Sequence, residues 1–182
     1  MKKLIALSLT LLTLQALCQT EMTVTVGGES MYPSKNIIEN AVKSTDHTTL
    51  VAAVQAAGLV ETLSGKGPFT VFAPVNDAFE NLPTGTVETL LKPENKAMLS
   101  GILTYHVLAG KYDFNALAAE IKKGKGTAKL KTVAGGMLTF TMNGEHNITI
   151  TDEKGNKANI SVYDVNQSNG VIHVIDEVMM PK

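Results

Sequence analysis

The stretch TVFAPVNDAF, residues 70–79, combines a strand, a sharp stop and the start of a helix. Its first half is rich in residues that favour strands, and the β-rich run ends at Pro74. Asn76 or Asp77 can then cap a short helix by accepting hydrogen bonds from its first amide groups, and the helix continues through Phe79. We therefore predict a strand followed directly by a capped helix.

Helical patterns lie on both sides of this stretch. Before it, residues 36–63 place apolar side chains at helical spacing, with a break at Gly58. After it, residues 84–91 and 93–105 are predicted to be helical, and the second of these carries an apolar stripe that ends at His106. The first half of the chain is therefore expected to be mainly helical.

The pattern changes after Gly110 to short strands separated by glycine-containing turns. Alternating apolar and polar residues predict strands at residues 129–133, 137–142, 147–151 and 159–162. A last run, residues 171–175, is apolar enough to be a buried central strand. Helices followed by an antiparallel meander predict an α+β fold.

The first 18 residues have the pattern of a secretory signal peptide, with two lysines before an uncharged, apolar-rich stretch too short to span a bilayer. We expect cleavage after Cys18, a short N-terminal arm over residues 19–34 and one folded domain over residues 35–182. Lipid anchoring at Cys18 is the less favoured alternative, because Leu17 stands where the lipoprotein peptidase normally requires a small residue.

Composition excludes several classes of function. All 16 basic residues are lysines, and removal of Lys2 and Lys3 with the signal leaves 14 of them against 17 acidic residues. A mildly acidic protein without arginine is not expected to bind nucleic acid. The single cysteine also leaves with the signal, which excludes a disulfide framework.

No motif in the chain predicts catalysis or cofactor binding. His47, His106, His146 and His173 lack the spacing of metal ligands, and the chain has no nucleophile elbow, dinucleotide fingerprint or phosphate loop. We therefore expect no metal, no cofactor and no enzymatic activity. Beyond the signal there is no apolar stretch of about 18 residues, so no transmembrane segment is expected.

A cluster of lysines is the most highly charged feature of the sequence. One interpretation is a patch that faces anions, either an acidic polysaccharide or lipid headgroups. The other is a solvated loop whose like charges keep an adjacent strand edge from pairing. The cluster, called the lysine patch below, consists of Lys122, Lys123, Lys125, Lys129 and Lys131.

Three segments in order resemble the conserved boxes of the fasciclin-type domain. They are residues 70–79, with Val75 where the family usually has threonine, the pair Tyr105 and His106, and the sequence NGVIHVID at residues 169–176. The resemblance covers residues 37–181 and is greatest to small secreted single-domain proteins of bacteria. It implies N-terminal helices packed on a mainly antiparallel β-sandwich or wedge.

The family boxes are interpreted first as architecture. Gly170 is expected to allow either a positive φ or a close backbone approach before the last strand. The expected structural motif consists of Thr70, Phe72, Ala73, Pro74, Asn76, Phe79, Asn169, Gly170, His173 and Asp176.

The resemblance also implies a function in adhesion. Animal members use an Asp-Ile pair and the tyrosine-histidine region for integrin contact, which implies partner-binding roles here for Asp164, Val165, Tyr105 and His106. Packing and hydrogen bonding are the favoured interpretation for Tyr105 and His106.

The expected function is therefore a non-enzymatic, exported interaction module. It would act in cell adhesion or in matrix and cell-surface association, with a protein or a polysaccharide as partner, in the periplasm, at the cell surface or in the medium. The alternative is a carrier of small ligands or lipids in the cell envelope, with a pocket between helices and sheet.

Overall fold

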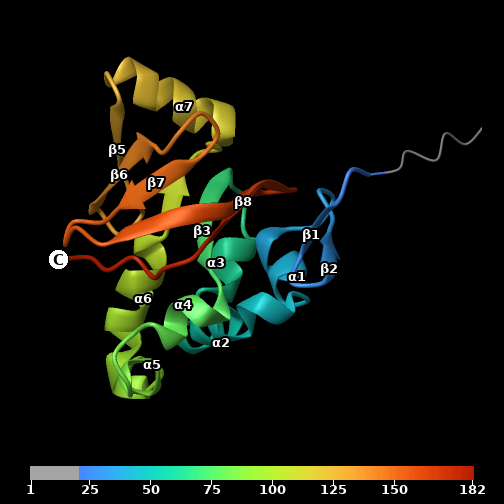
Figure 1. The fold of residues 1–182 in the computed structure, drawn as a ribbon. Coiled ribbons are helices and arrows are strands. Elements are labelled where there is room, and N and C mark those ends of the chain that lie inside the picture. Colours follow the sequence, from blue (N-terminus) through green and yellow to red (C-terminus); the bar gives the residue numbers. More distant parts are fainter. Residues whose placement is uncertain (1–20) are drawn as a thin grey trace, which may run out of the picture.

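The computed structural model describes residues 21–182, so the expected signal peptide over residues 1–18, with Cys18, lies outside the described residues. Helices dominate the first half of the described chain and strands the second half, which confirms the α+β class (Figure 1). The helices are α1 (Ile37–Ala41), α2 (Thr48–Ala57), α3 (Val60–Ser64), α4 (Asn76–Glu80), α5 (Thr86–Leu90), α6 (Lys96–Tyr105) and α7 (Phe114–Lys123), with 3₁₀ turns at Thr45–His47 and Pro93–Asn95. The strands are β1 (Val24–Val26), β2 (Glu29–Met31), β3 (Phe69–Pro74), β4 (Val107–Ala109), β5 (Thr127–Lys131), β6 (Met137–Met142), β7 (Ile148–Thr151), β8 (Lys157–Gln167) and β9 (Gly170–Ile175).

Seven strands form one strongly curved sheet in the order β4-β3-β9-β8-β7-β6-β5. Neighbouring strands are antiparallel except β3 and β9, which are parallel. A bridge between Leu108 and Thr132 links the β4 end to the β5 end, so the sheet is nearly closed. The prediction of a mainly antiparallel sheet is confirmed, with one parallel pair, β3 and β9, next to β4.

That parallel pair explains the glycine at position 170, at the start of the last strand. Gly170 lies opposite Phe69, and a Cβ atom on Gly170 would lie 2.1 Å from the carbonyl oxygen of Phe69. The close backbone approach is therefore the reason for glycine here, whereas the alternative of a positive φ is not what the structure shows.

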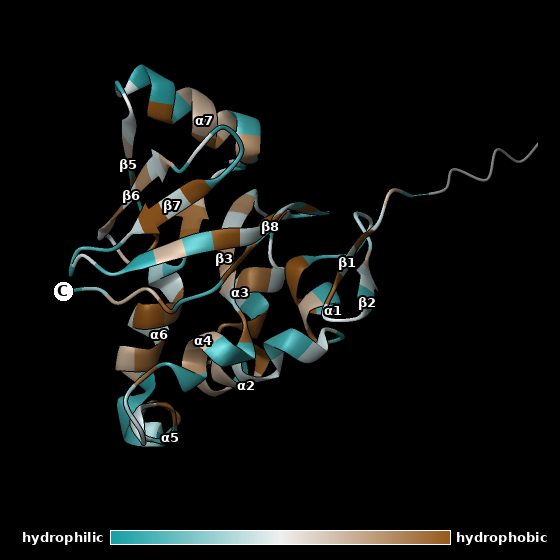
Figure 2. Ribbon diagram, viewed as in Figure 1, coloured by the Kyte–Doolittle hydropathy of each residue, from teal (hydrophilic) through white to brown (hydrophobic). Residues whose placement is uncertain are grey.

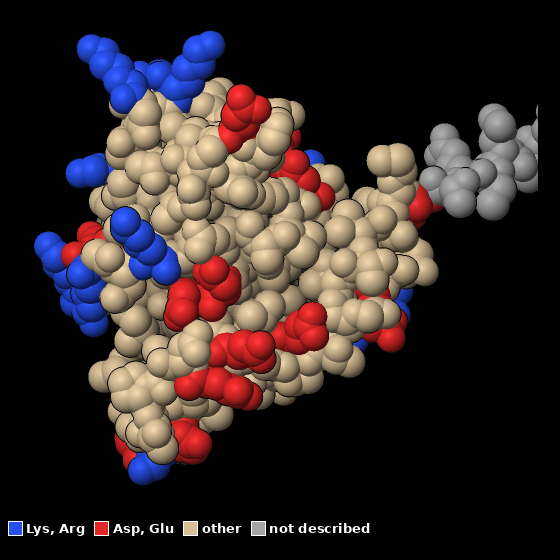
Figure 3. All heavy atoms as spheres, viewed as in Figure 1, with Lys and Arg blue, Asp and Glu red and all other residues tan. Residues whose placement is uncertain are grey.

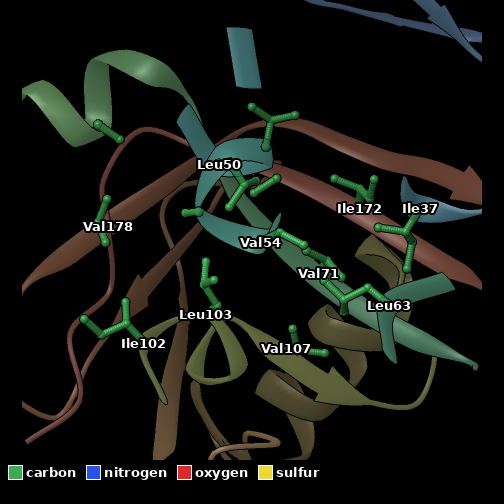
Figure 4. Close-up of a cluster of buried hydrophobic side chains, with 14 of the residues drawn as sticks. Ile37, Leu50, Val54, Leu63, Val71, Ile102, Leu103, Val107, Ile172 and Val178 are labelled. Atoms are coloured by element: carbon green, nitrogen blue, oxygen red, sulfur yellow. The ribbon is translucent and has the colours of Figure 1, made fainter. Parts of the chain in front are cut away.

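The central strands are buried on both faces because they separate two hydrophobic clusters. Val71 and Ile172 point into a cluster formed with the helices, called the helix-side cluster below. Phe72 and Ile175 point into a second cluster beneath the meander and α7. Figure 4 shows the first cluster, with side chains from α1, α2, α3 and α6 converging on β3, β4 and β9. Apolar residues follow these inner elements in Figure 2, and polar residues occupy many of the turns.

The single helical pattern expected over residues 36–63 forms three short helices and a 3₁₀ turn. Gly58 ends α2 in the left-handed conformation, with φ of 72°, which confirms the predicted break. Its amide group and that of Leu59 donate to the last free carbonyl groups of α2.

Part of the expected N-terminal arm packs onto the domain. Residues 24–31 form the β1–β2 hairpin, and Val26 and Met31 are buried in the helix-side cluster. The hairpin turn begins at Gly27, whose carbonyl oxygen accepts hydrogen bonds from the amide and the hydroxyl group of Thr45.

Helix α7 was not predicted, although residues 114–123 contain no glycine or proline and place Phe114, Leu117 and Ile121 at helical spacing. Asp113 caps this helix by accepting a hydrogen bond from the Ala116 amide at 2.8 Å. None of the helices formed by residues 21–182 is long and apolar enough to cross a membrane.

Candidate functional site

Tyr105 and His106 end α6, and both side chains are buried. The Tyr105 hydroxyl donates to the carbonyl oxygen of Met137 at 2.9 Å and accepts from the Glu153 amide at 3.1 Å. The pair of hydrogen bonds ties α6 to β6 and to the turn before β8. This environment agrees with the packing interpretation of Tyr105.

His106 connects α6 to the C-terminal segment. Its Nδ1–H group donates to the carbonyl oxygen of Ile102 at 2.8 Å, and its Nε2 atom accepts from the Met179 amide at 2.9 Å. Both ring nitrogens are therefore engaged in the neutral tautomer, and only 3% of the residue is exposed. Neither nitrogen is left for a metal ion or a partner in this conformation.

The burial of His106 predicts an acid-sensitive fold. Burial lowers the pKa of His106 from 6.5 to about 4, so the unfolded chain takes up a proton at higher pH than the folded chain. The free energy of unfolding then has its full value above pH 6.5 and falls as the pH decreases to about 4. We expect a loss on the order of 3 kcal/mol from this residue across that window.

Urea unfolding at a series of pH values in this window tests the prediction. A His106→Gln variant, which does not titrate, should show a shallower decline than the unchanged protein. Burial also lowers the pKa of His47 and of His173, so part of the decline will persist in the variant. Identical pH dependence of the two proteins would contradict the role of His106.

Asp164 and Val165 lie where β8 is irregular. The register with β9 shifts between Val162 and Val165, and Asp164 adopts a left-handed conformation with φ of 57°. Its Oδ1 atom accepts from the Phe114 amide at 2.7 Å, at the start of α7, while Val165 is buried in the helix-side cluster. Of the four expected partner-binding residues, only Asp164 is even partly exposed, and its carboxylate already holds α7.

His173 is the buried polar residue of β9. Its Nε2–H group donates to the carbonyl oxygen of Tyr112 at 2.8 Å, and its Nδ1 atom accepts from the Asp164 amide at 3.3 Å. Its ring stacks on Phe72, with a distance of 5.6 Å between ring centroids. His173 therefore joins β9 to the bulge of β8 and to the loop before α7.

The other family positions also hold the backbone together. The Thr70 hydroxyl donates to the carbonyl oxygen of Gly110 and accepts from the Tyr112 amide, both at 2.8 Å. Asp176 accepts from the amide and from the side chain of Asn159. In the first family segment, residues 70–79, Ala73 and Pro74 are buried at the end of β3, and Phe79 packs against the helix-side cluster.

Asn76 caps a different helix from the one predicted. It lies at the first position of α4 but makes no cap there, and its Oδ1 atom instead accepts from the amide of Thr49, at the start of α2, at 3.0 Å. Its Nδ2 group donates to the carbonyl oxygen of Thr45. The prediction that Asn76 or Asp77 caps α4 was wrong, because no side chain caps α4 and packing brings the start of α2 within reach of Asn76.

Asn169 joins three elements with one side chain. Its Nδ2 group donates to the carbonyl oxygens of Leu63 at 2.8 Å and Gly65 at 2.9 Å, and its Oδ1 atom accepts from the Ile37 amide at 3.0 Å. The residue thereby links the end of α3 and the start of α1 to the turn between β8 and β9.

Sequence reasoning missed Asp152, a carboxylate that is only 5% exposed. It accepts hydrogen bonds from the amides of Lys154 and Asn156 in the β7–β8 turn and from the Met180 amide of the C-terminal segment. The turn sequence DEKGN was a usable signal, since an aspartate before such a turn commonly accepts from the amides that follow it.

The lysine patch covers the end of α7, the turn after it and β5, and all five of its side chains are exposed. Figure 3 shows blue side chains gathered over this end of the molecule and along the adjoining edge, with a band of acidic side chains lower on the same face. Lys123 pairs with Glu120 at 3.4 Å, and no other member of the patch forms an ion pair within the described residues. The patch is thus a cationic surface with little internal compensation.

The positions of these lysines also give them two structural roles. Lys122 and Lys123 lie in the last turn of α7, where positive charge is favourable to the helix dipole. Lys129 and Lys131 lie on β5, the end strand of the sheet, where charge discourages pairing with another chain. These roles and the binding of anions use the same exposed ammonium groups and are compatible.

The apolar cavities bordering the helices are small. One, between α1, α2 and α3, has a volume of about 60 Å³, and another, beside α3 and α6, about 30 Å³. Small-molecule pockets start at roughly 300 Å³, so neither cavity accommodates a lipid chain. Among residues 21–182, no three His, Cys, Asp or Glu side chains are placed to hold a metal ion.

Comparison with known proteins identifies a matching protein family. A family model described as Fasciclin domain matches residues 45–181. Protein sll1483 of Synechocystis is 48% identical over 162 residues, which are 89% of this chain and 82% of that protein. Transforming growth factor-beta-induced protein ig-h3 of Sus scrofa is 37% identical over 132 residues, 72% of this chain and 17% of that protein.

A solved structure shows the same fold. It contains a FAS1 domain pair from the insect cell adhesion molecule fasciclin I, and it matches with a TM-score of 0.71 at 17% sequence identity. The match covers 88% of this chain and 58% of that chain. At this level of identity the likeness concerns the fold alone.

Proposed function

Because the chain belongs to the fasciclin domain family, we propose that it is a non-enzymatic interaction module for cell-surface or matrix association. Adhesion and matrix association are the roles for which the fasciclin domain family is known, and this supports adhesion as the general role. In this proposal residues 1–18 direct export and are removed, and residues 35–182 form the module, which acts in the periplasm, at the cell surface or outside the cell.

The observation that carries the proposal is a contrast between the buried polar residues, which are hydrogen-bonded, and the exposed lysines of the patch, which are mostly unpaired within residues 21–182. The polar residues of the family boxes are occupied by hydrogen bonds that hold the fold, as shown for Tyr105, His106 and His173. The lysine patch, in contrast, offers five exposed cations. We therefore assign partner binding to the lysine patch, with an anionic surface polymer such as an acidic polysaccharide as the partner.

The mechanism is electrostatic complementarity across an extended surface. A polymer of regularly spaced carboxylates or sulfates can contact lysines on the end of α7 and on β5 at the same time. Exposed pairs of opposite charge are individually weak, so affinity depends on several contacts and on ionic strength. Asp164 lies beyond this surface and in the proposal remains a residue that supports α7.

Binding to immobilised acidic polysaccharide tests this proposal. The purified protein should bind saturably to an alginate or heparin resin and dissociate as salt increases beyond the physiological range. Replacement of Lys122, Lys123 and Lys125 by glutamine should weaken binding roughly tenfold or more at physiological salt. Circular dichroism of the variant should be unchanged, because all three side chains are exposed.

The matched control replaces Lys43, Lys92 and Lys182 by glutamine, which removes the same charge from exposed positions outside the patch. This control should retain most of the binding. Equal loss in the two variants would show that net charge alone matters, and absence of saturable binding to either resin would overturn the assignment.

A further inference from the structure

A second polar feature lies away from the lysine patch, at the turn between β8 and β9. It is an open cavity of about 690 Å³, with walls formed by the loop after α3, by the residue that follows Gly110 and by the β8–β9 turn. The residues that line it include Lys66, Lys111, Ser64 and Ser168. No aspartate or glutamate is among the lining residues, so the two ammonium groups face no carboxylate there.

Hydrogen bonds fix the two lysine-bearing loops beside each other. The Gly110 amide donates to the carbonyl oxygen of Pro68 at 2.9 Å. This hydrogen bond places Lys111 next to the loop that carries Lys66. On the opposite side, the Asn169 side chain holds the carbonyl oxygen of Gly65 at 2.9 Å. The rim of the cavity is therefore preorganised by backbone contacts.

Glycine makes this rim possible. A Cβ atom on Gly67 would lie 2.0 Å from the carbonyl oxygen of Asn169, so the loop approaches the β8–β9 turn closely only without a side chain. The same loop leaves backbone groups available, since the amides of Lys66 and Gly67 donate no hydrogen bond to any described residue. The hydroxyl groups of Ser64 and Ser168 likewise make no hydrogen bond within residues 21–182.

The cavity thus combines two cations, free amide donors and two hydroxyl groups that can both donate and accept. This set matches a ligand that carries an anionic group next to hydroxyl groups. The volume lies within the usual range for small organic ligands, roughly 300–1,000 Å³, and is larger than an inorganic anion requires.

We propose that this cavity binds an acidic sugar, with Lys66 and Lys111 contacting its carboxylate and Ser64 and Ser168 contacting its hydroxyl groups. This site is separate from the lysine patch, because none of the five patch residues lines the cavity. The inference goes beyond the proposed function and stands whether or not the patch binds a polymer.

Titration of the ¹⁵N-labelled protein with D-galacturonate tests the proposal. The amide signals of Gly65, Gly67 and Gly170 should shift saturably, and a Lys66→Gln, Lys111→Gln double variant should bind roughly tenfold more weakly. A Lys43→Gln, Lys92→Gln double variant carries the same charge change outside the cavity and should bind as the unchanged protein does.

Two further ligands and one further variant complete the test. D-galactose, which lacks the carboxylate, should bind much more weakly, and inorganic phosphate should bind more weakly than galacturonate. The Lys122, Lys123 and Lys125 variant should retain galacturonate binding. No saturable shift, phosphate binding equal to that of galacturonate, or loss of binding in the lysine-patch variant would each overturn the proposal.

Discussion

Replacement of Gly170 by alanine is expected to destabilise the protein by about 3 kcal/mol or more. The added Cβ atom would lie 2.1 Å from the carbonyl oxygen of Phe69 and 3.0 Å from its nitrogen. These are backbone atoms of the neighbouring central strand, so the clash cannot be relieved by a change of rotamer. The parallel pair β3–β9 must separate locally, and urea unfolding followed by circular dichroism measures the cost.

The matched control is Gly101→Ala in α6. Apart from its chain neighbours and the backbone of α6 itself, no atom lies within 4 Å of the position that its Cβ would take, and its φ is not positive. Alanine should there stabilise the helix by up to about 1 kcal/mol, because glycine is the poorer helix former. Effects of similar size and sign at the two positions would contradict the packing argument for Gly170.

The second large effect is expected for Asn169→Asp, a change that keeps the shape of the side chain. A carboxylate oxygen would replace the Nδ2 group that donates to Leu63 and Gly65, and would face two carbonyl oxygens instead. The loss of two donors and the new repulsion should cost about 3 kcal/mol of the free energy of unfolding. Thermal and urea unfolding at neutral pH provide the measurement.

Asn115→Asp is the control for that charge change. Asn115 is exposed in the first turn of α7, where a negative charge is mildly favourable to the helix dipole. The stability of the Asn115→Asp variant should be equal to or slightly above that of the unchanged protein. If both aspartate variants lost the same stability, the effect would come from net charge and not from the contacts of Asn169.

Local pattern was sufficient for the elements with strong periodicity. The stripe of α6 and the alternation of β6 predicted buried faces, and the apolar run 171–175 predicted the central strand. The strand order was not predicted, because no local signal indicates that β9 pairs in parallel with β3. The α+β class followed from the order of helices and strands alone.

What the sequence could not predict depended on contacts between distant residues. Asn76 has the side chain of a cap, but which helix it caps is decided by the packing of α2 beside α4. β8 was expected to end at residue 162, yet it continues through the bulge at Asp164 because its far half pairs with the start of β9. Burial of Val165 follows from the same bulge, which shifts the register with β9.

The site predictions differ in the same way, because exposed charge can be read from the sequence and contacts between distant residues cannot. Exposed charge can be inferred from composition, and the lysine patch is indeed on the surface. The cavity at Lys66 and Lys111 could not be inferred, since its two lysines are separated in sequence and are brought together by the Gly110–Pro68 hydrogen bond. A glycine-lysine-glycine loop alone is too common a pattern to indicate a site.

The position of β9 between β3 and β8 has a consequence for the order in which the chain can fold. Its partner β3 is complete once residue 74 has been synthesised, but β9, which separates the two clusters together with β3, is supplied only by residues 170–175. Contacts between such distant parts of a chain form slowly, because a long loop must be closed before they contribute. A nascent chain without this last strand lacks the neighbour with which both β3 and β8 pair, so the sheet can be completed only when nearly the whole chain is present.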